Sequence, residues 1–178
     1  MTVFVAGVHG VGKSYLCQQY EGVFTAIHES ASGLIRKERA LVDWSVDKKV
    51  SDIDSNQAAL CRAVERICSA GKNLLLDGHF VLIGERAEFL PIDVSVFESL
   101  SISGVVLIEA EPALILSRLA ARDLSKSVVD VSLFVQAERL HARAVCDRLD
   151  IPLYVLHEPD FGEFSQVVSF LFESAQVE

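Results

Sequence analysis

The chain has 178 residues, a length that suits one ordinary domain with a sizeable core. Hydrophobic residues make up 51% of it and charged residues 23%, a balance that excludes a largely disordered protein. Against 16 Lys and Arg stand 25 Asp and Glu, so the formal net charge is -9. Such a surface repels phosphate backbones and anionic lipid heads, which argues against binding to free nucleic acid or to a membrane. Any anionic ligand must therefore be bound by a local site.

The sequence favours a cytoplasmic protein. Residues 2–6 run straight into a glycine-rich loop, without the basic region and the longer apolar stretch of a signal peptide. No stretch approaches the roughly 20 apolar residues of a membrane span. The four cysteines do not have the spacing of a zinc site or of a disulfide framework. The hydrophobic content is compatible with a homo-oligomer.

Short apolar runs alternate with helical patterns along the chain. The runs that predict strands are Thr2–Ala6, Val23–Ile27, Asn73–Asp77, Gly104–Glu109 and Pro152–His157. The patterns that predict helices are Ser14–Tyr20, Ser55–Ala70, Pro112–Arg122, Asp130–Leu149 and Glu163–Ala175. This alternation predicts a single α/β domain over residues 1–178, in which helices cover both faces of a parallel five-stranded sheet. Ligands are expected at the carboxyl ends of the strands.

The strongest motif is a GxxxxGK[ST] pattern at residues 7–14, GVHGVGKS, with a strand pattern before it and a helix pattern after it. Glycines let the backbone N–H groups turn inward around phosphate oxygens, and the following helix adds the positive end of its dipole. Lys13 can then reach the β- and γ-phosphates, and the Ser14 hydroxyl can ligate Mg²⁺. His9 is either a tolerated variable position or a contact to phosphate or water. The predicted ATP and Mg²⁺ site comprises Gly7, His9, Gly10, Val11, Gly12, Lys13, Ser14 and Tyr15.

Phosphoryl transfer also needs a carboxylate that organises Mg²⁺ or its water, and this group usually stands at the end of a neighbouring strand. Asp77 ends the apolar run 73–77 and is the candidate, with an Asp that merely opens a turn as the alternative. Glu109 ends the next apolar run and is the rival for the same role. His79 either lines the site or caps the strand.

The order of three segments, GVHGVGKS, LLLDGHFVL and VVLIEAEPALILSRLAARD, resembles archaeal-type adenylate kinases and the related P-loop nucleoside and nucleotide kinases. The resemblance covers nearly the whole chain. It implies the three-layer P-loop NTPase fold of adenylate kinases, with an acceptor-binding insertion at about 28–70 and a short lid at about 122–130. The cofactors that it implies are ATP and Mg²⁺, and the partner is a small-molecule nucleotide or nucleoside acceptor.

The resemblance also implies roles for single residues. Asp77 and His79 match the family's D-x-H pair, at the junction of the donor and acceptor sites. Gln57 matches a glutamine near the acceptor base, while Arg118 and Arg122 match arginines on the stem of the lid. The implied catalytic residues are Lys13, Asp77, Arg118 and Arg122, and the implied metal ligands are Ser14 and Asp77.

The basic cluster at Arg36 and Arg39 lies in the presumed acceptor region. These two arginines are candidates for substrate binding together with Gln57 and His79, although a solvated helix face is the alternative for the cluster. Three functions therefore stay open. The first is transfer of the ATP γ-phosphoryl group to a nucleoside monophosphate. The second is transfer to a hydroxyl acceptor, with Asp77 as the base. The third is a regulatory ATPase switch that acts on a protein or RNA–protein partner.

Overall fold

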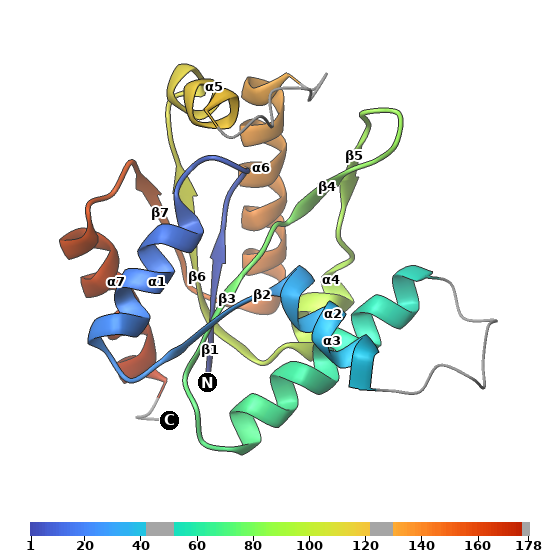
Figure 1. The fold of residues 1–178 in the computed structure, drawn as a ribbon, viewed down its shortest axis with the longest axis vertical. Coiled ribbons are helices and arrows are strands. Elements are labelled where there is room, and N and C mark those ends of the chain that lie inside the picture. The colour runs from blue at the N-terminus through green and yellow to red at the C-terminus, as the bar shows by residue number, and fades with distance from the viewer. Residues whose placement is uncertain (42–51, 122–129, 176–178) are drawn as a thin grey trace.

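The fold is a computed structural model that describes residues 1–41, 52–121 and 130–175. Its centre is a parallel five-stranded sheet (Figure 1). In chain order the strands of this sheet are β1 (Thr2–Ala6), β2 (Ile27–Ser30), β3 (Leu74–Asp77), β6 (Ile102–Glu109) and β7 (Leu153–His157). Their spatial order is β2-β3-β1-β6-β7, and every neighbouring pair is parallel. The predicted sheet is therefore confirmed.

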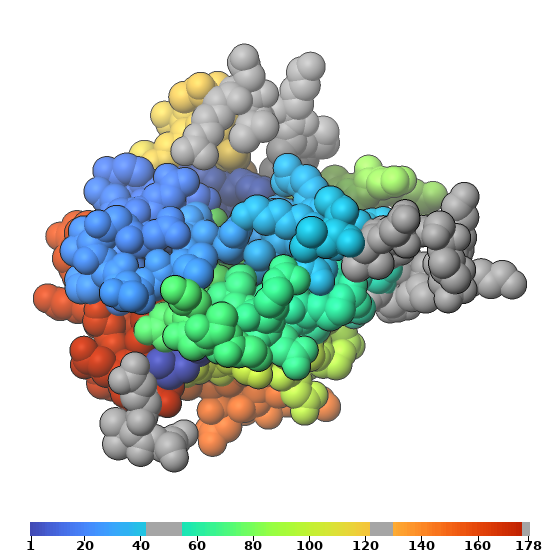
Figure 2. Space-filling view, turned by 60° about the horizontal axis from the view of Figure 1, so that its bottom comes forward, coloured from blue at the N-terminus to red at the C-terminus, as the bar shows by residue number. Residues whose placement is uncertain are grey.

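Helices cover both faces of the sheet, as predicted. The helices α1 (Lys13–Val23) and α7 (Phe161–Ser174) pack together on one face. The other face carries α6 (Val131–Leu149), which contacts α4 (Val94–Ser99) and α5 (Pro112–Ala120). Helices α2 (Ala31–Leu41) and α3 (Asp52–Ser69) pack against each other, and they contact β2 and β3, respectively. Figure 2 shows the two helices side by side, in light blue and green-cyan. A small antiparallel hairpin of β4 (Val81–Ile83) and β5 (Phe89–Pro91) contacts α6.

The core lies on both sides of β1. All five residues of this strand are buried, as a continuous apolar run in the middle of a parallel sheet requires. Aromatic rings extend the core toward the second face of the sheet. Phe4 meets Phe80 edge to face at a centroid distance of 5.2 Å, and Phe80 stacks on Phe97 at 4.6 Å. This packing fixes the carboxyl end of β1, where the glycine-rich loop begins.

The predicted second strand is wrong in position. Residues 23–27 were expected to form it, but helix α1 continues to Val23 and the strand begins only at Ile27. The N–H group of Phe24 ends the helix by donating to the carbonyl of Tyr20 at 2.8 Å. The rings of Tyr20 and Phe24 also stack, at a centroid distance of 4.4 Å. Local helical hydrogen bonds and ring packing thus outweigh the strand propensity of the Val-Phe-Thr segment.

Within the described residues, four elements have no counterpart among the predicted ones: helix α2, helix α4 and the two strands of the β4–β5 hairpin. The predicted helix Pro112–Arg122 ends at Ala120, and Arg122 lies outside the described residues. Most of the predicted lid at 122–130 also lies outside them. None of the helices in the described ranges combines the length and the apolar character that a bilayer span requires.

Candidate functional site

The glycine-rich loop connects β1 to α1, and three of its residues need the conformational freedom of glycine. Gly7, Gly10 and Gly12 have φ angles of 135°, 89° and 107°, a region that L side chains rarely adopt. A Cβ atom on Gly7 would also lie 2.3 Å from the carbonyl oxygen of Ile108 on β6. The loop is therefore a backbone cradle that side chains would fill, and it fits the phosphates of a nucleotide.

Gly7→Ala is expected to lower the free energy of unfolding by about 2 kcal/mol or more, because it adds both a positive-φ strain and an overlap with β6. The matched control is Gly22→Ala in helix α1, where a Cβ atom meets nothing within 4 Å. That control should stabilise the protein by about 0.5–1 kcal/mol, as Ala does in a helix. Urea unfolding of both variants measures the difference, and equal effects would contradict the close approach of Gly7 to β6.

Lys13 is the first residue of α1 and is only 6% exposed. Its Nζ atom donates to the carbonyl oxygens of Gly7 at 2.6 Å and Val8 at 3.2 Å. Asp77 Oδ1 lies 3.9 Å from the same nitrogen. Burial lowers the pKa of Lys13, and the nearby Asp77 charge opposes that shift. The lysine of the motif is thus held inside the loop by carbonyl groups and one carboxylate.

Asp77 ends β3, the strand next to β1, and its carboxylate meets the first turn of α1. The Ser14 hydroxyl donates to Asp77 Oδ2 at 2.5 Å. Burial raises the pKa of Asp77, but the His28 ring, the Lys13 charge and the Ser14 hydroxyl outweigh it and hold the pKa below its ordinary value. The structure therefore brings the two predicted metal ligands into direct contact, the neutral Ser14 hydroxyl donating to the ionised Asp77 carboxylate.

This oxygen pair fits Mg²⁺, a hard cation that a P-loop protein binds through one hydroxyl and one carboxylate while nucleotide phosphates and water supply the other ligands. Within the described residues, no group of three or more His, Cys, Asp or Glu side chains could hold a metal ion. Ser14 and Asp77 together supply two oxygen donors, so any Mg²⁺ held here would take its remaining ligands from phosphate and water.

Three histidines lie near Lys13 and Asp77. The rings of His9, in the loop, and His79, after β3, lie 4.4 Å apart with an interplanar angle of 52°. Burial lowers the pKa of His79 to about 3, and burial also lowers the pKa of His9. These two rings are therefore neutral near pH 7. His28 on β2 was not predicted from the sequence: it is 10% exposed, and its Nε2 lies 3.7 Å from Asp77 Oδ2.

Arg118 reaches the loop from helix α5. Its Nη1 donates to the carbonyl oxygens of Gly10 at 3.1 Å and Val11 at 3.0 Å. The predicted lid arginine thus contacts the loop itself. The predicted nucleotide contact Tyr15 lies on α1 and is 63% exposed. For Arg118, the spacing in the sequence could not distinguish a hydrogen bond to the loop carbonyls from a contact to phosphate.

The predicted acceptor residues lie on the α2–α3 pair, which follows β2 directly. Arg36 is exposed on α2, and its side chain forms no hydrogen bond or ion pair in the part of the chain that the structure describes. Arg39 donates to Asn56 Oδ1 on α3 at 2.8 Å. Gln57, also on α3, is half-buried. Their part in substrate binding stays a prediction.

Glu109, the rival of Asp77, has a different partner. Its carboxylate accepts two bonds from the guanidinium of Arg139 on α6, one of them from Nε at 2.5 Å. The carboxylate that contacts Ser14 is Asp77.

The structure also reveals Glu138, a buried carboxylate that was not predicted from the sequence. This α6 side chain is 1% exposed and accepts hydrogen bonds from the backbone N–H groups of Gly7, Phe80 and Val81. A signal for it was present: Glu138 falls on the same helical face as the apolar residues Phe134, Ala142 and Val145, all of them buried. An acidic residue on an apolar face is the pattern that marks a buried, hydrogen-bonded group.

Comparisons with known proteins agree with this geometry. Residues 6–132, more than half of the chain, match the sequence model of the family described as AAA domain. No curated protein matches the chain. A solved structure, an uncharacterized protein from Eubacterium ventriosum, aligns over 98% of both chains with a TM-score of 0.52 and 7% sequence identity. At that identity the likeness shows the fold alone.

Proposed function

Because the chain belongs to the AAA domain family and is thus a nucleotide-binding P-loop protein of the kinase or ATPase type, we propose that it is a nucleoside monophosphate kinase. In this proposal it uses ATP and Mg²⁺ and transfers the γ-phosphoryl group to a small nucleotide acceptor. The acceptor would bind beside β2 and β3, against the α2–α3 pair.

The donor side of the proposal rests on the loop and on helix α1. The amides of residues 7–14 and the Lys13 ammonium would hold the ATP phosphates, while Ser14 and Asp77 would hold Mg²⁺. The bound metal supplies charge neutralisation of the phosphates and a fixed orientation for them. Arg118, through its bonds to the carbonyls of Gly10 and Val11, would keep the loop in shape.

We base the choice of a phosphate acceptor on the ionisation and hydrogen bonding of Asp77. The pKa of Asp77 lies below the ordinary value, and its Oδ2 accepts a hydrogen bond from the Ser14 hydroxyl at an oxygen–oxygen distance of 2.5 Å. A carboxylate in this state is a good metal ligand but a weak base. A phosphate acceptor is already ionised and needs no base, whereas a hydroxyl acceptor must give up a proton. The geometry of Asp77 therefore favours the phosphate acceptor.

The proposed step balances without a proton transfer. An oxygen of the acceptor phosphate forms a bond to the γ-phosphorus, and the bond between that phosphorus and the β–γ bridging oxygen breaks, which leaves ADP. Lys13 would stabilise the charge on the transferring group, and the lid residue Arg122 would add a second cation. Arg36, exposed and without a partner among the described residues, is the proposed contact to the acceptor phosphate.

An acceptor panel with γ-labelled ATP tests the proposal. The panel contains nucleoside monophosphates, nucleosides, sugars and water alone, each with Mg²⁺. We expect labelled nucleoside diphosphate from at least one monophosphate, at a rate well above the release of inorganic phosphate. Label on a nucleoside or sugar hydroxyl would instead assign the hydroxyl-acceptor reaction. Release of inorganic phosphate in every arm would assign an ATPase.

A further inference from the structure

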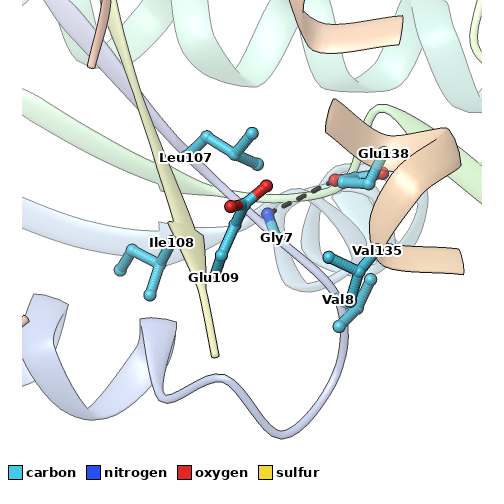
Figure 3. A pocket seen from close by; sticks show the side chains of 7 residues that line it. All are labelled: Gly7, Val8, Leu107, Ile108, Glu109, Val135 and Glu138. Carbon is cyan, nitrogen blue, oxygen red and sulfur yellow. Dashed lines mark hydrogen bonds between the residues drawn. The ribbon is translucent and has the colours of Figure 1, made fainter. Parts of the chain in front are cut away.

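Glu138 occupies an unusual position for an acidic side chain. It lies on α6 at the base of the glycine-rich loop, and Figure 3 shows its carboxylate facing the Gly7 amide. Neither of its oxygens forms an ion pair among the described residues. The adjacent Arg139 binds Glu109 instead. The charge is therefore held by backbone amides, with the Lys13 ammonium as a more distant source of attraction.

The three amides come from two segments, the glycine-rich loop and the chain that follows β3. Oε1 accepts from Gly7 N at 3.3 Å, the first amide of the loop, and from Phe80 N at 2.9 Å, after β3. Oε2 accepts from Val81 N at 2.8 Å, the first residue of β4. One carboxylate thus joins the loop to the segment that follows the proposed metal ligand Asp77. Because Oε1 accepts from both Gly7 N and Phe80 N, a shift of the loop that moves Oε1 also alters the hydrogen bond to Phe80.

Glu138 cannot itself be a contact to the nucleotide. The hollow in front of it, lined by Gly7, Val8, Leu107, Ile108, Glu109, Val135 and Glu138, is too narrow to admit a ligand. The side chain also approaches Gly7 from the side of α6, with its own oxygens occupied by amide donors. Its influence on a bound phosphate must therefore pass through the backbone.

We infer that Glu138 is a positioning residue for nucleotide binding: by holding the Gly7 amide and the Phe80–Val81 amides on one carboxylate, it sets the shape of the phosphate-binding loop and couples that loop to the start of the β4–β5 hairpin. A carboxylate suits this role because both of its oxygens accept, whereas an amide side chain presents one acceptor and one donor. This inference rests on nucleotide binding by the loop and not on the transfer step, so a failed acceptor panel leaves it intact.

The first test compares Glu138→Gln with wild type in calorimetric titrations with ADP and Mg²⁺. In the variant at least one of the three amides must face an NH₂ group, so we expect affinity at least about tenfold weaker. The control for general destabilisation is Val145→Ala on the same helix, a buried position two turns further on. It should lower the unfolding temperature but keep its affinity within about twofold of wild type.

The second test uses the wild-type protein, so it tests the positioning role of Glu138 even if Glu138→Gln does not fold. Amide hydrogen exchange of the wild-type protein is followed by NMR with and without ADP and Mg²⁺. We expect the nucleotide to slow exchange at Phe80 and Val81 as well as at Gly7, because the three amides share one carboxylate. Unchanged exchange at Phe80 and Val81, wild-type affinity in Glu138→Gln, or equal weakening in Val145→Ala would each overturn the inference.

Discussion

Lys13→Ala is expected to lower the affinity for ATP and Mg²⁺ by at least about a hundredfold, as the loss of a buried charged partner of the phosphates should. The side chain is 6% exposed and lies inside the loop, with the carbonyls of Gly7 and Val8 around its ammonium. In a chain with a net charge of -9, the proposed attraction for a triphosphate depends on the backbone dipoles of the loop and on the few cations beside it, of which Lys13 lies inside the loop and Arg118 against its carbonyls.

Isothermal titration calorimetry measures the effect, with Lys72→Ala as the control. Lys72 is exposed in the turn before β3, so its removal changes the net charge by the same amount without touching the loop. Circular dichroism should show the same secondary structure in both variants. Wild-type affinity in Lys13→Ala, with the fold intact, would refute the assignment of the nucleotide site.

Asp77→Asn is expected to lower the rate of phosphoryl transfer by about tenfold to a thousandfold, the range for loss of a metal-positioning group. The substitution keeps the size of the side chain but removes the negative charge, next to the Ser14 hydroxyl at 2.5 Å and the Lys13 ammonium at 3.9 Å. The proposed metal site would then be left with one neutral oxygen from Ser14 and one from the new amide.

The rate is measured with the acceptor that the panel identifies, over a range of Mg²⁺ concentrations. A metal-holding role predicts that high Mg²⁺ partly restores the rate, whereas a purely structural role does not. Asp147→Asn, an exposed position on α6, is the control for the change in charge. A wild-type rate in Asp77→Asn would show that Asp77 is not the metal-positioning carboxylate and would make Glu109 the candidate for that role.

Local patterns carried the predictions that the structure confirms. The strand before the loop, the loop itself and the helix after it are contiguous in sequence, so their spacing alone defines the cradle. The strands β3 and β6 are buried on both faces, and their continuous apolar runs indicated a parallel sheet. Ser14 and Asp77 were predicted as ligands of one metal, a role that stays a prediction; their side chains meet because the loop after β1 and the carboxyl end of the neighbouring strand β3 lie at one edge of the sheet.

The features that the sequence did not predict depend on contacts between distant segments. Glu138 lies 131 residues from Gly7, and no spacing rule connects an acid on a late helix to the first amide of the loop. His28 reaches Asp77 only because β2 pairs with β3, and the misplaced second strand hid that register. The start of β2 was missed because the end of α1 depends on the packing of Tyr20 against Phe24.

The strand order has a consequence for how this protein is made. β1 precedes the other described strands in the chain, yet it stands in the middle of the sheet: Phe4 pairs with Leu76 on one side and with Val105 on the other. Its neighbours are therefore synthesised about 70 and 100 residues later, so folding has to wait for non-local pairing. The amide of Gly7 receives its partner Glu138 later still. β1 and the start of the glycine-rich loop therefore obtain their full set of hydrogen-bond partners only after helix α6 has been synthesised.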